Sequence, residues 1–188
     1  AGVAVDNSGG VYFSGDISDT TDFDDSGGND TLTVPGPKNA YITKYDTSGN
    51  YQWTRVFGGA NHWVLPGNIT TDSSGDVYVT GYIYDLPWGS PGSFPVDFDG
   101  TAGTDNRYID VTDNGAAFTT KYNSDGSYGW TRLIDGGTYE DGTDVVVNSS
   151  GEVFSVGIFE GTVDFDDSGA TDNLVASGTD FYITKYSS

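Results

Sequence analysis

Cysteine and methionine are both absent from the 188 residues, and histidine occurs once, as His62. Without cysteine the chain has no disulfide framework and no thiol chemistry, although this absence leaves the cellular compartment open. A lone histidine offers little for acid–base catalysis, so we interpret His62 as incidental. No apolar run approaches the roughly 18 residues of a membrane-spanning helix. The sequence therefore points away from thiol enzymes and from insertion into a membrane.

Basic residues are scarce, with seven Lys and Arg against 28 Asp and Glu, and the formal net charge is −21. Such a field repels nucleic acids and anionic membranes, so we expect neither as a partner. The same charge opposes compaction unless cations screen or bind the carboxylates. Two interpretations stay open: a charged surface that serves solubility or adaptation to a salty medium, or binding of divalent cations by clustered Asp.

Glutamate is rare among the acids and is limited to Glu140, Glu152 and Glu160, while aromatic residues make up 14% and glycine occurs 28 times. Helices favour Glu, Lys, Leu and Ala, so this balance disfavours them. It suits strands of Val, Ile, Thr, Tyr and Phe joined by turns of Asp, Gly, Ser and Asn. The composition predicts an all-β fold, in one domain over 1–188.

Four sequence patterns recur in the same order along the chain. The first is a strand, a tight turn and a second strand: VAVDNSGGVYFSG (3–15), ITTDSSGDVYVTG (69–81) and VVVNSSGEVFSVG (145–157). The second is acidic: TDFDDSGGND (21–30), VDFDGTAGTD (96–105) and VDFDDSGATD (163–172). The third is a strand: AYITKYD (40–46), AFTTKYN (117–123) and FYITKYS (181–187). The fourth occurs in two copies only: YQWTRVFGG (51–59) and SYGWTRLIDGG (127–137).

Each copy reads as two hairpins, and the third copy ends at KYSS without the fourth pattern. Four antiparallel strands in each repeat predict a blade of a β-propeller. We therefore expect three four-stranded antiparallel blades, over about 1–59, 60–137 and 138–188, the third lacking its last strand. A β-sandwich is the alternative fold.

Three blades do not close a ring, because propellers have about four blades or more. We therefore expect an open assembly or one completed by a partner chain. Three explanations stay open: a fragment of a longer propeller, half of a six-bladed dimer, or a polymer subunit whose unpaired blade edge takes a strand from a neighbour. The expected partners are accordingly the remaining blades of a longer chain or other copies of this one. The opening AGVAVD, without Met, suits a mature or excised segment.

The four motifs resemble the bacterial SBBP-type β-propeller repeat. The resemblance rests on VAVDNSGGVYFSG, the VDFD segment, the ITKYD strand and the WTR strand, and it covers nearly the whole chain apart from insertions in the second copy. It implies a propeller-like fold, a place outside the cell or on the bacterial cell surface, and a role in surface structure or adhesion. It implies no catalytic residues, so we expect a non-enzymatic protein.

The acidic pattern has the residue types of a calcium loop. Aligned on its first Asp, it shares the Asp-x-Asp-x-Ser/Thr spacing and a later Asp with the first nine positions of an EF-hand loop. The candidate ligands are Asp22, Asp24, Ser26 and Asp30; Asp97, Asp99, Thr101 and Asp105; and Asp164, Asp166, Ser168 and Asp172. Because Ca²⁺ takes about 6–8 oxygen ligands, the three clusters predict Ca²⁺ as a cofactor.

A complete EF-hand loop would also need a closing Glu, and Thr33, Tyr108 and Val175 stand at that position. We therefore expect a weak site completed by carbonyl groups, water or a neighbouring blade. The alternative is an Asx-rich turn, in which the Asp side chains accept hydrogen bonds from backbone amides.

Four aromatic residues, Trp63, Tyr82, Tyr84 and Trp88, cluster around the insertions of the second copy. Exposed aromatic rings on loops can stack on the apolar faces of sugars, so these residues predict an alternative function, carbohydrate binding. The competing interpretation is that Trp88 and Phe94, among Pro87, Pro91 and Pro95, pin a long loop to the blade.

Overall fold

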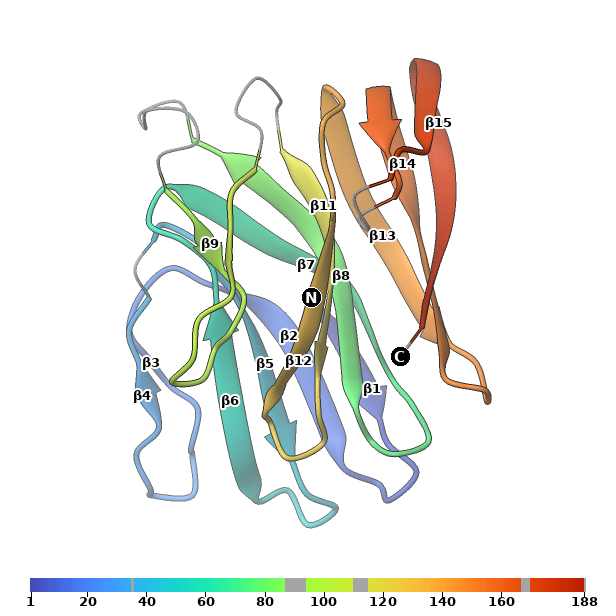
Figure 1. Cartoon of the computed structure of the whole chain (residues 1–188). Helices are drawn as coiled ribbons and strands as arrows, with labels where there is room; N and C mark the ends of the chain where they lie inside the picture. Colours follow the sequence, from blue (N-terminus) through green and yellow to red (C-terminus); the bar gives the residue numbers. More distant parts are fainter. Residues whose placement is uncertain (35, 87–93, 110–114, 167–169, 188) are drawn as a thin grey trace.

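The computed structural model describes residues 1–34, 36–86, 94–109, 115–166 and 170–187, and within these ranges the fold is all-β with no helix. The expectation of an all-β chain is thus confirmed. The main strands form three antiparallel sheets, and four short strands form two ribbons beside them (Figure 1). None of the described residues belongs to a helix able to cross a membrane.

The first sheet has the order β1-β2-β5-β6 and contains β1 (Gly2–Val5), β2 (Val11–Ile17), β5 (Asn39–Tyr45) and β6 (Tyr51–Phe57). The second has the order β7-β8-β11-β12, with β7 (His62–Thr71), β8 (Val77–Asp85), β11 (Ala116–Tyr122) and β12 (Tyr128–Ile134). The third has the order β13-β14-β15, with β13 (Tyr139–Val147), β14 (Glu152–Asp164) and β15 (Asn173–Ser187). These strands are the hairpin strands expected from the repeated patterns.

The acidic segments of the first two copies form the ribbons, and the third does not form a separate one. β3 (Thr21–Asp22) pairs with β4 (Thr31–Leu32), and β9 (Val96–Asp97) pairs with β10 (Asn106–Arg107). In the third copy the equivalent residues continue the main strands, because β14 and β15 still pair at Asp164 and Asn173. The sequence did not predict this difference between copies.

The first hairpin of every copy has the same turn. Its glycine, Gly9, Gly75 or Gly151, has a φ of 84°, 80° or 82°, a backbone conformation that glycine adopts at little cost. The first residue of the turn accepts hydrogen bonds from the amides two and four residues later, as Asp6 does from Ser8 and Gly10. The repeated Asp/Asn-x-Ser-Gly motif therefore fixes the register of each first hairpin.

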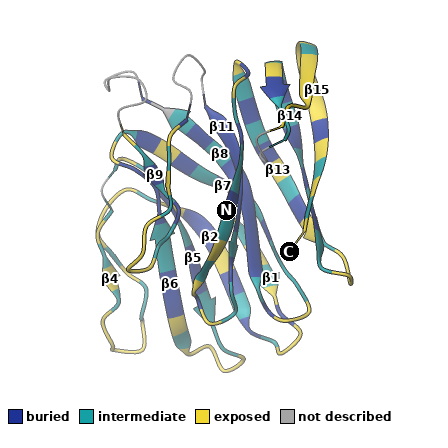
Figure 2. Ribbon diagram, in the orientation of Figure 1, coloured by how far each residue is buried: buried dark blue, intermediate teal, exposed yellow. Residues whose placement is uncertain are grey.

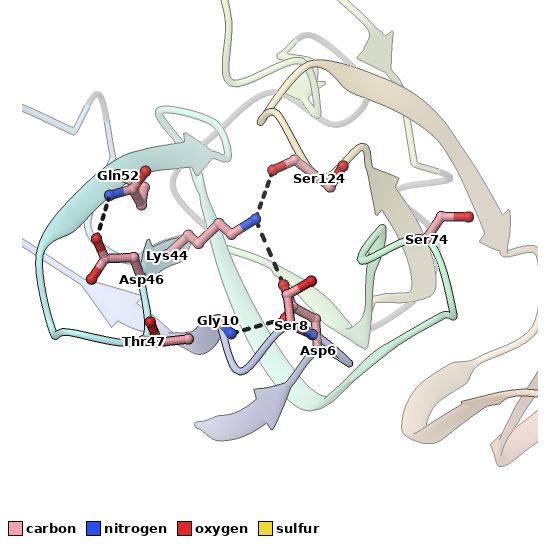
Figure 3. A pocket seen from close by; sticks show the side chains of 9 residues that line it. All are labelled: Asp6, Ser8, Gly10, Lys44, Asp46, Thr47, Gln52, Ser74 and Ser124. Carbon is pink, nitrogen blue, oxygen red and sulfur yellow. Dashed lines mark hydrogen bonds and ion pairs between the residues drawn. The ribbon is translucent and has the colours of Figure 1, made fainter.

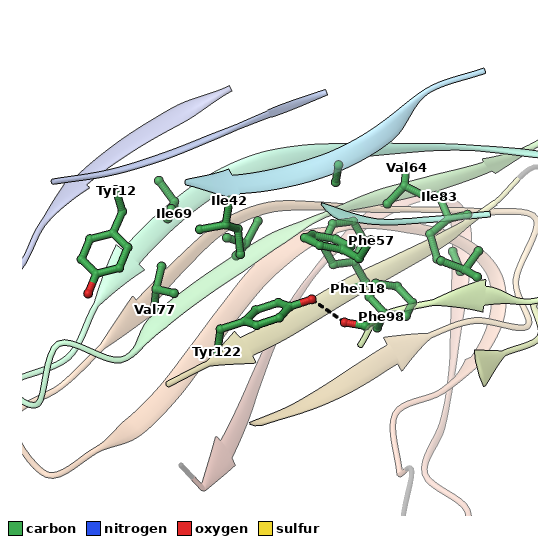
Figure 4. Close-up of a cluster of buried hydrophobic side chains, with 14 of the residues drawn as sticks. Tyr12, Ile42, Phe57, Val64, Ile69, Val77, Ile83, Phe98, Phe118 and Tyr122 are labelled. Carbon is green, nitrogen blue, oxygen red and sulfur yellow. Dashed lines mark hydrogen bonds between the residues drawn. The ribbon is translucent and has the colours of Figure 1, made fainter. Parts of the chain in front are cut away.

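The sheets pack face to face in chain order, so each has a forward face toward the following sheet and a backward face toward the preceding one. β1 packs against β7, and β7 packs against β13. The largest apolar core lies between the first and second sheets and includes Phe57, Phe98 and Phe118 (Figure 4). Two smaller clusters lie between the second and third sheets, around Tyr182 and Tyr78. Burial between sheets therefore holds the stack together.

Strand alternation separates the two faces of every sheet. In β8 the residues Val77, Val79 and Ile83 are buried against the first sheet, whereas Tyr78 belongs to the cluster shared with the third. The junction of the second and third sheets also contains hydroxyl groups, with Thr119 Oγ1 3.1 Å from Ser155 Oγ. Figure 2 shows that the second sheet is mostly buried or half-buried, while β15 is mostly exposed.

Candidate functional site

The first Asp of each acidic segment closes its loop through backbone amides. Asp22 Oδ1 accepts hydrogen bonds from the amides of Asp24, at 3.1 Å, and Asp30, at 3.0 Å. Asp97 Oδ1 accepts the equivalent pair at 3.0 and 2.9 Å, and Asp164 Oδ1 accepts it at 3.0 and 2.8 Å. One carboxylate oxygen thus joins both ends of each loop, as in an Asx-type turn.

The second Asp turns inward within its own loop. Asp24 Oδ1 accepts the amide of Ser26 at 3.0 Å, and Asp99 Oδ1 accepts the amide of Thr101 at 2.9 Å. The hydroxyl of that Ser or Thr donates to the same oxygen. Ser168, the equivalent residue of the third copy, lies outside the described residues.

The last Asp of the first two loops faces the fourth strand of its own sheet. The hydroxyl of Tyr51 donates to Asp30 Oδ2, and the hydroxyl of Tyr128 donates to Asp105 Oδ2. Asp105 also forms an ion pair with Arg107 at 3.0 Å. Burial raises the pKa of Asp30, and the charge of Arg55 partly opposes this. These tyrosine contacts were not foreseen, because they join segments about 20 residues apart, a separation at which the sequence gives no spacing signal.

The amide hydrogen bonds account for the shape of the acidic loops. Among the described residues, no three or more Asp, Glu, His or Cys side chains gather in a group that could hold a metal ion. The carboxylates of one copy are therefore spread along the loop. Calcium binding at these residues stays a prediction.

Two of the four candidate aromatic residues form a pair. The rings of Trp63 and Tyr84 have centroids 5.8 Å apart, and Lys38 Nζ lies 5.6 Å from the centre of the Trp63 ring. Trp63 is partly exposed, and Tyr82 is half-buried two residues before Tyr84 on β8. Trp88 lies outside the described residues. The structure therefore brings a Trp–Tyr pair together at the start of β7.

A polar hollow of about 330 Å³ lies where the turns of the first and second sheets meet (Figure 3). Lys44 crosses it and donates to the carbonyl of Ser124 at 3.0 Å, with Asp6 Oδ2 at 3.8 Å. Lys44 Nζ also lies 4.9 Å from the centre of the Tyr12 ring. Burial and the charge of Asp6 raise the pKa of Tyr12, so its hydroxyl stays protonated and donates to the carbonyl of Gly75.

The same lysine arrangement recurs in the second sheet, where Lys121 pairs with Asp76 at 2.9 Å and lies 5.5 Å from the Tyr78 ring. This repetition indicates a structural role, in which each lysine neutralises an acid at a junction between sheets. His62 is buried in β7 and is not among the residues that line the hollow. The sequence analysis missed this arrangement, although the recurring Lys of the KYD motif was its visible signal.

The forward face of the third sheet is exposed. Phe181 and Ile183 are 78% and 68% exposed, although the equivalent residues of the first sheet, Ala40 and Ile42, are fully buried on the second sheet. Val146 on β13 adds to the same exposed face. The third sheet thus presents an apolar surface that its equivalents use for packing.

The backward face of the first sheet is exposed in a complementary way. Val3, Val5 and Phe13 are exposed there. The residues of the second sheet equivalent to Val3 and Phe13 are Ile69 and Val79, and both are buried against the first sheet. The forward face of the third sheet and the backward face of the first sheet are therefore the equivalents of the two faces that pack together between the first and second sheets.

Comparison with known proteins gives a limited similarity. No known family model matches the chain. Over 140 residues it is 26% identical to the uncharacterized WD repeat-containing protein L264 of Acanthamoeba polyphaga mimivirus, a match that covers 70% of this chain and 9% of that protein. The chain therefore spans a small part of the relative it matches. Together with the antiparallel sheets, this similarity indicates a repeat, β-propeller-like protein. The SBBP type is not confirmed and stays a prediction.

Proposed function

We propose that this chain is a non-enzymatic structural module that acts by packing against another protein, built as an open β-propeller of three blades. The partner is a second copy of the chain, whose first sheet covers the third sheet of the first copy. One observation carries the proposal: the forward face of the third sheet is exposed where the equivalent faces are buried. The similarity to a WD-repeat protein supports a repeat interaction module of this general kind.

The proposed contact joins two different faces, so it is heterologous. Two copies joined in this way at both ends would form a ring of six blades, while a rotation that does not close would give an open chain of copies. The net charge of −21 repels a second copy at low ionic strength. Salt should therefore favour the association.

We expect the chain to form dimers or larger assemblies at roughly 1 M NaCl, where the Debye length is about 3 Å. Sedimentation velocity measures the size. Ile183→Asp places a charge in the forward face of the third sheet and should return the chain to a monomer of 19.9 kDa. Tyr108→Asp is the control, because Tyr108 is an exposed aromatic residue that follows β10 and belongs to neither end face.

A mixture of variants tests the direction of the contact. Val3→Asp charges the backward face of the first sheet and should also give a monomer. Mixed with the Ile183→Asp chain it should form a dimer, because one intact face of each kind remains. A wild-type chain that stays monomeric, or a Val3→Asp chain that assembles as well as wild type, would contradict the proposal.

We also propose an extracellular or bacterial cell-surface setting and stabilisation by calcium. The support is the strong acidity, the resemblance to the surface repeat and the threefold recurrence of the acidic segment. Bound calcium would reduce the repulsion among the carboxylates of each loop.

Calcium should raise the melting temperature and EDTA should lower it. For sites with Kd of about 0.1–1 mM, 1 mM Ca²⁺ stabilises the fold by about 0.4–1.4 kcal/mol for each site. In a domain of this size that corresponds to about 1–5 °C for each site. Asp99→Asn should reduce the response, whereas Asp19→Asn, outside the loops, should leave it intact. Equal melting temperatures in calcium and in EDTA would end the calcium hypothesis.

Carbohydrate binding is the second candidate function, favoured by the partly exposed Trp63, whose ring lies beside that of Tyr84 at an interplanar angle of 37°. Two neighbouring rings of this kind can receive the apolar face of a sugar. We expect binding on a glycan array to disappear with Trp63→Ala or Trp88→Ala and to persist with Phe13→Ala. If no glycan on the array binds, the carbohydrate hypothesis is wrong and only the structural role remains.

A further inference from the structure

The outer edge of β15, which faces away from β14, ends the third sheet. In the first two sheets the corresponding strands, β5 and β11, pair on this side with a fourth strand, β6 or β12. Among the described residues β15 pairs with β14 only. Its outer edge therefore presents backbone amides and carbonyls to which another strand can bond.

Three contacts fix the fourth strand in the sheets that have one. A threonine pair joins it to the third strand of the repeat, with Thr54 Oγ1 donating to Thr43 Oγ1 at 2.9 Å. A tyrosine pair packs edge to face, with Tyr45 and Tyr51 centroids 6.0 Å apart. The hydroxyl of that second tyrosine donates to the last Asp of the acidic loop, Asp30.

The second sheet repeats all three contacts. Thr120 and Thr131 have their Oγ1 atoms 2.8 Å apart, and the rings of Tyr122 and Tyr128 are 5.7 Å apart. The hydroxyl of Tyr128 again donates to the last Asp of the acidic loop. A strand carrying Tyr-x-Trp-Thr is thus held by the same three residue types in both sheets.

All three receiving residues recur in the third sheet. Alignment on the lysine of the third strand places Thr184 with Thr43 and places Tyr186 with Tyr45. Asp172 is the last Asp of the third loop, held in the same way by Asp164 Oδ1 at 2.8 Å. Asp172 is exposed, and Thr184 is half-buried. The third sheet therefore has the receiving residues of a fourth strand.

The third sheet also has an aromatic residue at the position that contacts the tryptophan in the first two sheets. Trp53 packs edge to face on Tyr12, and Trp130 packs in the same way on Tyr78. Phe154 on β14 occupies the equivalent position and is half-buried. A tryptophan on an added strand would find an aromatic ring beneath it.

We propose that the outer edge of β15 is a binding site for an extended segment that carries the sequence Tyr-x-Trp-Thr-Arg. The segment adds antiparallel to β15, its tyrosine hydroxyl donates to Asp172, its threonine meets Thr184 and its tryptophan covers Phe154. This site is an edge, whereas the proposed contact between copies uses faces, so it is independent of the proposed function.

The test uses the full chain with Val3→Asp, which keeps it monomeric, and a fluorescent peptide of residues 49–58, GNYQWTRVFG. We expect saturable binding by fluorescence anisotropy and slower hydrogen exchange of the β15 amides. A scrambled peptide should not bind. Replacing the peptide tyrosine by phenylalanine, or Asp172 by Asn, should weaken binding about two- to tenfold, the effect of one hydrogen bond. Asp180→Asn, an exposed acid on the same strand, is the matched control.

Backbone methylation distinguishes strand addition from other binding. An added strand forms hydrogen bonds through the amides of alternate residues. We therefore compare two peptides, one N-methylated at the odd-numbered residues and one at the even-numbered residues. One of them should lose binding and the other should keep it. The proposal would be overturned if the unmodified peptide does not bind at up to about 1 mM, a concentration that detects even weak affinity. Equal binding of the two N-methylated peptides would also overturn it. If the wild-type chain does not self-associate but the peptide still binds to the Val3→Asp chain, the proposed function is wrong and the site on β15 stands.

Discussion

Replacement of Phe57 by alanine should lower the free energy of unfolding by about 3–5 kcal/mol, the usual range for truncating a buried phenylalanine. Phe57 ends β6, is 1% exposed, and its ring lies 5.6 Å from Phe98, 5.8 Å from Phe118 and 6.0 Å from Tyr122. It thus joins the first sheet to the second sheet and to the β9 segment. Phe118 and Tyr122 both lie on β11, whereas Phe98 follows β9, so two separate backbone segments would have to shift to fill the space that it leaves.

Urea denaturation at low ionic strength measures this loss on the monomer. The control is Phe181→Ala, which removes the same atoms from an exposed position on β15. Exposed substitutions usually change stability by about 0.5 kcal/mol or less. A loss below about 1 kcal/mol for Phe57→Ala would mean that the core between the first two sheets is not closely packed.

Gly81→Ala should destabilise the fold by about 1–3 kcal/mol, the cost of overpacking a dense core. A methyl group at this position would lie 2.2 Å from the carbonyl oxygen of Leu65, 2.9 Å from Phe118 Cζ and 2.9 Å from Pro66 Cα. Two of these neighbours are backbone atoms of β7, so a change of side-chain rotamer does not relieve the contact.

The control for this substitution is Gly129→Ala. A methyl group there would lie 3.0 Å from the carbonyl oxygen of Lys121, and its other near neighbours belong to the flexible lysine chain at 3.2 Å. We expect a smaller effect, measured by the same denaturation. Equal stability of Gly81→Ala and wild type would show that β7 and β8 can separate at this point.

A glycine occupies the position of Gly81 in each of the three sheets. Gly15, Gly81 and Gly157 stand directly opposite an aromatic residue on the neighbouring strand, Tyr41, Phe118 or Tyr182. The glycine leaves room for the ring to lie across its strand. At Gly157 an added methyl group would again meet a backbone atom, the carbonyl oxygen of Asp141 at 1.9 Å, so Gly157→Ala should also be harmful. At Gly15 the nearest atoms all belong to the Tyr41 side chain, at 2.7–2.9 Å, and a shift of that side chain should make the cost smaller.

The hairpins could be predicted from the sequence because their causes are local. The Asp/Asn-x-Ser-Gly turn, the alternation of apolar residues and the fourth pattern, present in two copies, correctly indicated sheets of four, four and three main strands. Only local backbone geometry and alternation were needed for this inference.

The contacts between segments could not be predicted in this way. The bond from Tyr51 to Asp30 depends on how the loop folds back on its sheet, and spacing along the chain carries no sign of it. The recurring lysine of the third pattern was a visible signal, but it did not show that Lys44 pairs with Asp6. The acidic loops show the limit most clearly. By residue type Asp22 fits both a calcium ligand and an amide acceptor, and its hydrogen bonds from the amides of Asp24 and Asp30 emerge only in the folded structure.

The apolar clusters lie between sheets, and this placement determines how stability is distributed. Only the second sheet is covered by described neighbours on both faces, so it alone gains from two interfaces. Stability in such a stack is a sum of terms between nearest neighbours. The first and third sheets can therefore fray one at a time, whereas unfolding of the second sheet removes both interfaces at once and leaves the first and third sheets joined through an unfolded stretch of chain.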